Sequence, residues 1–112
     1  MIEIRKMIIP QKCEVSQYFV SNVGEIFYKK DDQSDIISLP LYKANTGYIY
    51  CRILLNNLWQ ILSVDEIVAY TFNPEMYHHY NTSNKPVVIH KDYDNSNNLS
   101  YNLCWNMNCE YW

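Results

Sequence analysis

The sequence predicts an α+β fold, built from an antiparallel β meander, one helix and a short finger of strand, polar loop and closing segment. Three observations support this class. Short runs of β-branched and aromatic residues, separated by polar turns, fill the first 62 residues and indicate strands. Residues 64–72 carry apolar side chains at helical spacing. An apolar run then ends at His90, just before a loop rich in Asp and Asn.

The strand pattern starts with a hairpin over residues 18–28, where β-branched and aromatic residues flank the sequence Ser-Asn-Val-Gly. Three further segments have a similar composition and are expected to be extended: residues 36–39, 47–54 and 58–62. We expect all these strands to pair in sequence order as one antiparallel meander. Trp59 and Trp105 are expected to be core aromatics.

The helix is expected within residues 63–74. Ser63 can cap the first backbone amides, and Glu66 completes a Ser-x-x-Glu capping box. Pro74 disfavours helical geometry in the residue before it, so the helix should end there. The apolar positions of this segment share one face and should be buried: Val64, Ile67, Val68 and Phe72.

Length and composition indicate one domain, residues 1–112, with one modest core. The chain is 48% hydrophobic and 15% aromatic, which is enough for a globular fold. No apolar stretch approaches the ~18–20 residues of a membrane span, and the N-terminus has no signal-peptide core. We therefore expect no membrane partner and a cytoplasmic location. The four cysteines form no Cys-x-x-Cys pair, so reduced thiols are expected instead of a zinc site.

The formal net charge of −3 argues against strong nonspecific affinity for nucleic acid, because Lys and Arg supply most of that affinity. The charges are distributed unevenly. Residues 1–60 hold seven Lys and Arg against six Asp and Glu, whereas residues 61–112 hold two against six. A phosphate-binding face is therefore expected in the first half, with Lys29 and Lys30 as candidates. The alternative is that both are solvated surface lysines.

His90 ends an apolar strand and precedes a polar loop, an arrangement that suits phosphodiester hydrolysis. Such hydrolysis needs a base to activate water, a divalent ion to stabilise the leaving oxygen and a fixed loop that aims the histidine. His90 is the candidate base, because the pKa of histidine lies close to working pH. Asn102 follows twelve residues later, and its amide can clamp the loop backbone so that His90 is held in place.

Several ordered blocks of this sequence resemble HNH homing endonucleases of the phage intron-encoded type. Residues 18–24 read Tyr-Phe-Val-Ser-Asn-Val-Gly and match that family's Tyr-x-Val-Ser-Asn-x-Gly segment. Gly47-Tyr48 matches a Gly-Tyr strand, and residues 64–72 match a Val-x-x-x-Val-Ala helix that ends in Phe. Residues 87–105 match an apolar pair, a histidine, an Asp-rich loop and an Asn-Leu-x-Trp segment that enters a helix.

The resemblance covers the chain from about residue 12 to its end. It implies an N-terminal β module over residues 12–62, the helix over residues 63–74, and an HNH-like motif over residues 85–112. The last part would be a ββα-metal (His-Me) finger, truncated because no further DNA-reading segment follows it.

The same resemblance shows where this chain departs from the family. The acidic metal ligand that precedes the histidine is replaced by Ile89, and the last signature residue falls at Tyr111. Neither side chain suits a hard cation such as Mg²⁺. The basic pair of the family's helix is Asp65-Glu66 here, and a loop glycine is replaced by Tyr93. Three acids could act as substitute ligands or be solvated loop residues: Asp92, Asp94 and Glu110.

The resemblance therefore implies an HNH-derived small protein that binds DNA or a protein partner without catalysis and without a cofactor. His90 would be a vestigial general base, and Asn102 a loop clamp. Contacts to nucleic acid are expected from four side chains: Asn22, Lys29, Lys30 and Lys91. Two alternatives remain open. The chain is an active Mg²⁺-dependent HNH endonuclease or nickase, or it is a virus-encoded inhibitor that binds a host protein.

Overall fold

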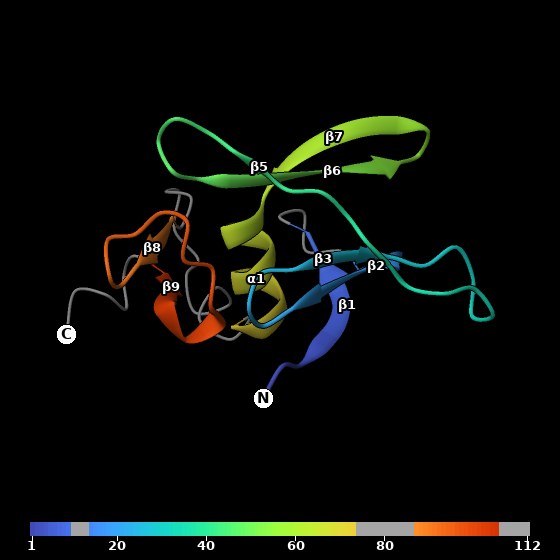
Figure 1. Cartoon of the computed structure of the whole chain (residues 1–112), viewed down its shortest axis with the longest axis horizontal. Coiled ribbons are helices and arrows are strands. Elements are labelled where there is room, and N and C mark those ends of the chain that lie inside the picture. Colours follow the sequence, from blue (N-terminus) through green and yellow to red (C-terminus); the bar gives the residue numbers. More distant parts are fainter. Residues whose placement is uncertain (10–13, 74–86, 106–112) are drawn as a thin grey trace, which may run out of the picture.

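The fold is α+β, as predicted, with antiparallel strands and one α-helix in the part of the chain that the structure describes (Figure 1). The computed structural model describes residues 1–9, 14–73 and 87–105. The helix α1 spans Val64–Phe72, and a short 3-10 turn, η1, spans Ser100–Asn102. The strands are Ile4–Ile8 (β1), Glu14–Ser21 (β2), Ile26–Tyr28 (β3), Ile37–Ser38 (β4), Tyr42–Lys43 (β5), Ile49–Leu55 (β6), Leu58–Ser63 (β7), Val88–His90 (β8) and Leu103–Trp105 (β9).

The N-terminal strands form two antiparallel meanders, whereas the sequence predicted one. The first sheet has the order β1-β2-β3-β4 and the second the order β5-β6-β7. Pro40 lies between β4 and β5, and proline lacks the N–H that ladder pairing needs, which favours a break at this point. Strand β1 was not predicted. It pairs with β2 through a register that shifts between Lys6 and Met7, and Met7 is fully buried.

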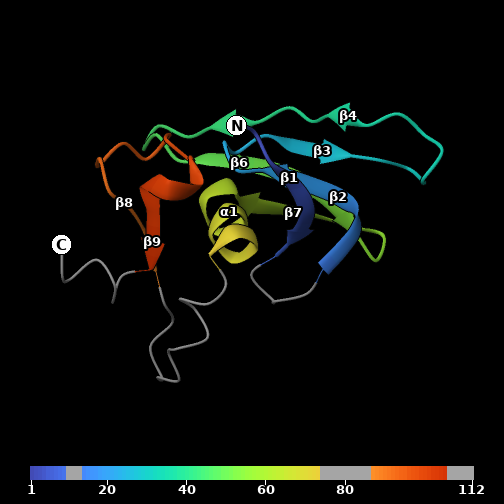
Figure 2. The ribbon, with the colours of Figure 1, turned by 90° about the horizontal axis from the view of Figure 1, so that it is seen from below.

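Helix α1 lies at the centre of the molecule, with the three sheets arranged around it (Figures 1 and 2). It contacts β1, β2, β6, β7, β8 and β9. The helical face predicted to be apolar is buried: Val64, Ile67 and Val68 are fully buried, and Phe72 packs against the core. The burial extends beyond this face, because Asp65, Ala69, Tyr70 and Thr71 are buried as well. Burial of this stripe on three sides is what stabilises so short a helix, since nine residues are too few to be helical alone. No helix in the described residues is long and apolar enough to cross a membrane.

The helix has the predicted bounds, but the side chain of Ser63 does not cap it as predicted. Ser63 occupies the N-cap position and makes no side-chain hydrogen bond to the helix amides. Its hydroxyl donates to a carboxylate oxygen of Asp65 instead. The prediction failed because Asp65, two residues on, offers that hydroxyl a charged acceptor, and hydrogen bonds to charged groups are the stronger ones.

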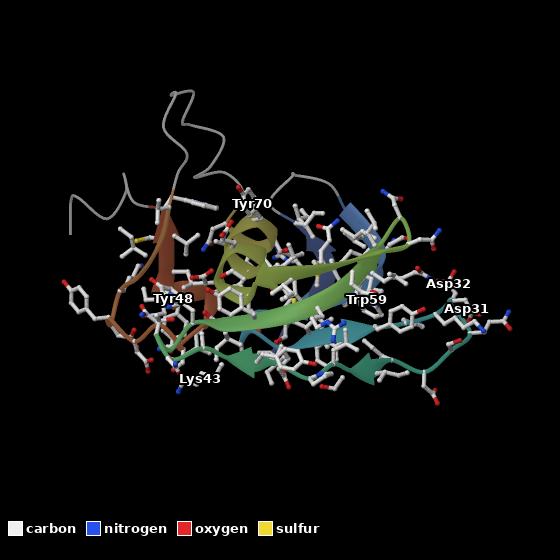
Figure 3. The ribbon with its side chains drawn as sticks, turned by 90° about the horizontal axis from the view of Figure 1, so that it is seen from above. Asp31, Asp32, Lys43, Tyr48, Trp59 and Tyr70 are labelled. Carbon is white, nitrogen blue, oxygen red and sulfur yellow. The ribbon has the colours of Figure 1, made fainter. Side chains whose placement is uncertain are left out.

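Trp59 does not lie in the core, contrary to expectation, whereas Trp105 does. Trp59 is 62% exposed and Trp105 is 1% exposed. Side chains alternate between the two faces of a strand, and β6 turns Cys51 and Ile53 toward the core. Trp59 pairs with Leu54, which faces away from the core, so Trp59 points outward as well. Figure 3 looks down on this outward face.

The segment Tyr18 to Gly24 connects the sheets to each other and to the finger. The Tyr18 hydroxyl accepts a hydrogen bond of 2.9 Å from the backbone amide of Leu54, which ties the first sheet to the second. Gly24 adopts φ +88°, and a Cβ added there would lie 2.9 Å from Cβ of Asn98. The glycine is therefore required both by the turn and by the close approach of the finger loop.

Candidate functional site

The finger consists of β8, the loop that follows it, η1 and β9. Strands β8 and β9 pair antiparallel, with His90 opposite Leu103. The Asn-Leu-x-Trp segment thus enters a second strand; the helix expected beyond it lies outside the described residues. Trp105 secures the finger to α1, since its indole N–H donates to the carbonyl of Asn73 at 3.1 Å and its ring meets Tyr70 edge to face.

Asn102 bridges the two ends of the finger loop. Its amide nitrogen donates to a carboxylate oxygen of Asp92 at 3.0 Å and to the carbonyl of Asn97 at 2.9 Å. Its amide oxygen accepts from the backbone N–H of Asp92 at 3.1 Å. The backbone amide of Lys91 adds a bond of 2.8 Å to the Asn102 carbonyl. The buried amide therefore uses both its donor and its acceptor to fix the loop.

The acids of the loop serve its own backbone and neighbouring side chains. Asp92 accepts from Asn97, Asn102 and the amide of Asp94, and these hydrogen bonds, that from Asn97 first, lower the pKa of Asp92. Asp94 accepts from the hydroxyl and the amide of Ser96, which lowers the pKa of Asp94 in the same way. Both carboxylates are held in turns, where short Asp side chains stabilise the backbone.

Tyr93 stands in a conformation that glycine prefers. Its φ is +61°, and its side chain is 88% exposed. The left-handed conformation costs an L-residue about 1–2 kcal/mol. The loop thus keeps its turn at this position although the sequence has a tyrosine where related proteins are expected to have glycine.

His90 is buried, and both of its ring nitrogens are occupied. Nδ1 lies 3.0 Å from the carbonyl oxygen of Asn97, and Nε2 lies 3.0 Å from Oδ2 of Asp65. The ring of Tyr48 meets the imidazole edge on, at 5.9 Å between ring centroids. Three separate segments thus position His90: the finger loop, the first turn of α1 and the residue before β6.

The geometry determines the protonation of His90. A carbonyl oxygen can only accept, so Nδ1 carries a proton and donates to Asn97. The carboxylate of Asp65 also accepts, so Nε2 donates to it when the ring is protonated. Burial lowers the pKa of His90, but the hydrogen bonds to Asp65 and Asn97 outweigh burial, so the pKa is raised above its ordinary value. In this state neither nitrogen can accept a proton from water.

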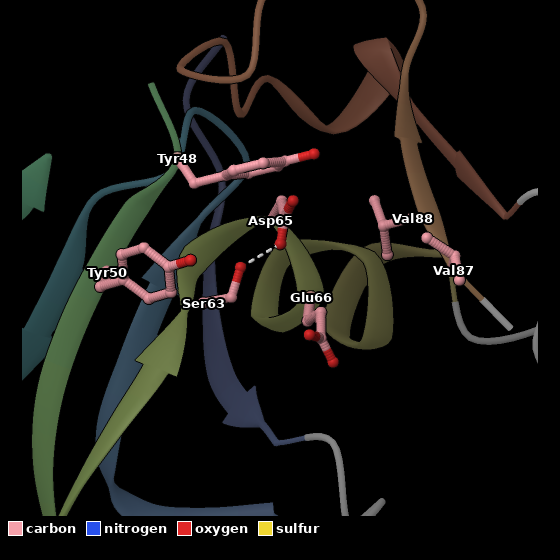
Figure 4. Close-up of a pocket in the computed structure, with 7 residues that line it drawn as sticks. All are labelled: Tyr48, Tyr50, Ser63, Asp65, Glu66, Val87 and Val88. Atoms are coloured by element: carbon pink, nitrogen blue, oxygen red, sulfur yellow. Dashed lines mark hydrogen bonds between the residues drawn. The ribbon is translucent and has the colours of Figure 1, made fainter. Parts of the chain in front are cut away.

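A hollow of about 320 Å³ lies beside this pair (Figure 4). Tyr48 and Tyr50 line one side of it, and the opposite side is formed by Val87 and Val88. Ser63, Asp65 and Glu66 complete the lining. Asp65 lines the hollow and His90 does not, so the carboxylate stands between the hollow and Nε2.

The described residues around His90 do not fit a Mg²⁺ site. Its neighbour in β8 is Ile89, which has no oxygen to offer, and the carboxylates of Asp65 and Asp92 are already hydrogen-bonded. Within residues 1–9, 14–73 and 87–105, no three His, Cys, Asp or Glu side chains are grouped closely enough to hold a metal ion. Glu110 and Tyr111 lie outside the described residues.

Neither cysteine in the described part of the chain offers an alternative chemistry. Cys51 is free but fully buried, and burial raises the pKa of its thiol to about 12, so it is an inert core side chain. Cys104 is disulfide-bonded, which corrects the expectation of reduced thiols at this position.

The four side chains predicted to contact nucleic acid are not brought together. Lys29 and Lys30 come directly after β3, and the next residues, Asp31 and Asp32, lie at the end of the molecule opposite the finger (Figure 3). These two acids offset the charge of the lysines. Lys91 is exposed on the finger itself.

Asn22 has structural contacts. Its amide oxygen accepts from the backbone of Glu3 at 2.9 Å, its amide nitrogen donates to the carbonyl of Met1 at 3.2 Å, and its carbonyl accepts from Ser100 at 2.7 Å. The residue therefore joins the segment before β1, the hairpin and η1.

Asp65 is the site residue that sequence reasoning missed. The replacement of a basic pair by Asp65-Glu66 was noted as a departure from the family, but not as a source of a partner for His90. The only signal in the sequence was the presence of an acid in the first turn of the helix, since a carboxylate can pair with a histidine if the two are packed together. Nothing in the local sequence shows that the two residues meet.

No family model and no curated protein matches this chain. A solved structure does match this chain, with a TM-score of 0.66 and 27% sequence identity. It is described as "DNA binding and cleavage by the HNH homing endonuclease I-HmuI". The fold of this chain is similar to that of an HNH endonuclease. The match covers 96% of this chain and 56% of the other, so this chain spans little more than half the length of I-HmuI. Both the N-terminal sheets and the HNH-like finger fall within the similarity.

Proposed function

We propose that this chain is an HNH-derived DNA-binding protein whose finger does not hydrolyse DNA. The observation that carries the proposal is the buried contact of 3.0 Å between Nε2 of His90 and Oδ2 of Asp65. A general base must accept a proton from the attacking water, and this nitrogen already donates to a carboxylate. The finger keeps the histidine, the clamp of Asn102 and the loop conformation at Tyr93, so its shape is retained without a free base.

The absence of a fitting ligand set beside His90 supports the same conclusion. Phosphodiester hydrolysis depends on a cation that stabilises the charge developing on the leaving oxygen. In the described residues, Ile89 stands beside His90, and the adjacent hollow is lined by Asp65 and Glu66. The negative charge of these carboxylates repels a phosphate, which disfavours the scissile group next to the imidazole.

DNA binding is proposed from the similarity to I-HmuI, whose structure is described as showing DNA binding and cleavage. Only a modest affinity is expected, because the chain has a net charge of −3 and its lysines are scattered. Duplex binding should therefore weaken steeply as salt is raised.

Two assays on the purified chain test the proposal. Supercoiled plasmid is incubated with the protein and either Mg²⁺ or Mn²⁺, and a labelled duplex is titrated with protein at two salt concentrations. We expect no nicked product and salt-sensitive binding. Metal-dependent nicking that disappears in His90→Ala would overturn the inactive assignment and favour the HNH nickase. Absence of any binding at low salt, to the duplex and to a labelled single strand alike, would overturn the DNA-binding assignment.

A further inference from the structure

The outward face of the sheet β5-β6-β7 is unusually rich in exposed aromatic and aliphatic side chains. This outer face is formed by residues that point away from α1 on the three strands: Tyr42, Arg52, Leu54, Trp59 and Ile61. Ile61 is 69% exposed and Trp59 62% exposed. Figure 3 shows Trp59 over this face and Lys43 at its edge. An apolar face of this kind on a folded chain marks a binding surface.

The outer face is also the part of the chain with a positive charge and no acid of its own. Residues 36–64 contain no Asp or Glu, and their two charged side chains are Lys43 and Arg52. The remaining sequence carries all twelve acids and seven of the nine basic residues, so it is net negative. A polyanion that approaches this chain is therefore attracted to the outer face and repelled from the rest.

The aromatic rings and the cations of the outer face lie next to each other. The guanidinium of Arg52 lies 5.0 Å from the centre of the Trp59 ring and covers one side of it. Two hollows of about 200 and 310 Å³ adjoin on the face, and both are lined by Tyr42 and Arg52. Lys43 lines the larger hollow, and Trp59 the smaller. Each hollow thus combines a ring with a cation.

We propose that the outer face binds single-stranded nucleic acid, with unpaired bases stacked on Trp59 and Tyr42 and backbone phosphates held by Arg52 and Lys43. Rings beside cations are the combination that sequence-tolerant single-strand binding uses. The inference deepens the proposed function and rests on it, since it names the surface and the form of nucleic acid that an HNH-derived binding protein would hold.

The number of cations on the outer face and the gain from base stacking both favour a single strand over a duplex. Duplex binding by charge alone rests on roughly six to ten phosphate contacts, and the outer face offers two cations. Exposed rings also gain little from a duplex, because the base faces there are already stacked on one another. With a single strand, by contrast, each stacked base adds to the affinity independently of charge.

Fluorescence anisotropy of a labelled oligothymidylate tests this proposal, with the labelled duplex measured in parallel. We expect Trp59→Ala to weaken oligothymidylate binding roughly tenfold and Trp59→Phe to retain most of it, because phenylalanine keeps a stacking ring. For two phosphate contacts, log K should fall against log salt with a slope of about −1.4. Arg52→Gln should reduce that slope to about −0.7.

Ile37→Ala is the matched control. Ile37 is 55% exposed on β4, in the other sheet, so its truncation removes a comparable exposed apolar side chain without touching the outer face. Circular dichroism confirms that each variant is folded. Equal losses in Trp59→Ala and Ile37→Ala would overturn the proposal, as would no oligothymidylate binding by the unaltered chain.

The duplex arm and a sedimentation measurement separate the remaining outcomes. Duplex binding without oligothymidylate binding overturns the outer-face proposal and leaves the proposed function standing. If the chain binds neither the duplex nor oligothymidylate, the outer-face proposal and the proposed DNA binding are both overturned. A dimer that Trp59→Ala dissociates, with no oligothymidylate bound, would show that the outer face is a protein interface and would likewise overturn the proposal.

Discussion

Nε2 of His90 lies 3.0 Å from Oδ2 of Asp65, although the two residues are 25 positions apart in the sequence. Their side chains are 2% and 7% exposed, so the pair is shielded from solvent. Removing one member of a buried pair leaves the other without its partner, which makes such pairs costly to break. The contact therefore affects both the stability of the fold and the chemistry left to the histidine.

Stability should decrease as pH rises through neutrality because of this pair. The pKa of His90 is raised in the folded state, so its contribution to the free energy of unfolding is fully present below the unfolded value of about 6.5 and is lost as pH rises through the folded pKa. Urea unfolding over this range measures the decrease, and Asp65→Asn should flatten it. The difference between the two proteins isolates His90 from the other two histidines. A folded-state pKa of His90 below its ordinary value, measured by NMR titration, would contradict the assignment.

Gly24→Ala should destabilise the fold by about 3 kcal/mol. Both the positive φ and the 2.9 Å approach of an added Cβ to Asn98 oppose the methyl group. Gly47 is the matched control, since it has a similar φ of +92° but its added Cβ would lie 3.5 Å from Asn95, an ordinary contact. Gly47→Ala should therefore cost only the conformational strain, about 1 kcal/mol. Denaturant unfolding of both variants gives the comparison. Equal losses in the free energy of unfolding would show that the close approach of Gly24 to Asn98 does not add to the cost.

Tyr93→Gly should stabilise the fold by about 0.5–1 kcal/mol. Relief of the left-handed strain at φ +61° outweighs the greater freedom that glycine gains in the unfolded chain. Tyr93→Ala keeps the strain and removes the same exposed ring, so it should leave the unfolding midpoint nearly unchanged. An equal gain in the alanine variant would assign the effect to loss of the ring instead of the backbone conformation.

Asn102→Ala should destabilise the fold by about 2–3 kcal/mol, since it removes three hydrogen bonds of a buried amide. Asn95 provides a control within the same loop, because its side chain makes one hydrogen bond, of 3.0 Å, to the carbonyl of Thr46. Asn95→Ala should cost no more than about 1 kcal/mol. Thermal unfolding of the two variants tests the difference, and comparable midpoints would mean that the loop does not depend on Asn102.

Much of the fold could be predicted from local sequence pattern. The hairpin around residues 21–24 and the bounds of α1 follow from turn residues, helical spacing and Pro74, all of which act within a few positions. The spacing of His90 and Asn102 likewise predicted a loop closed on itself. Such features are visible in the sequence because the forces behind them join near neighbours.

The tertiary structure decided which face of each strand is covered and which distant side chains meet. The alternation in β7 is compatible with Trp59 inside or outside, and only the position of α1 beneath the second sheet turns it outward. From the sequence, Asp65 is expected to be a solvated acid at the start of a helix. In the structure, the finger packs His90 against it. The sequence alone therefore predicted the loop that Asn102 holds, whereas the packing of α1 between the sheets and the finger determined that His90 is bound to a carboxylate.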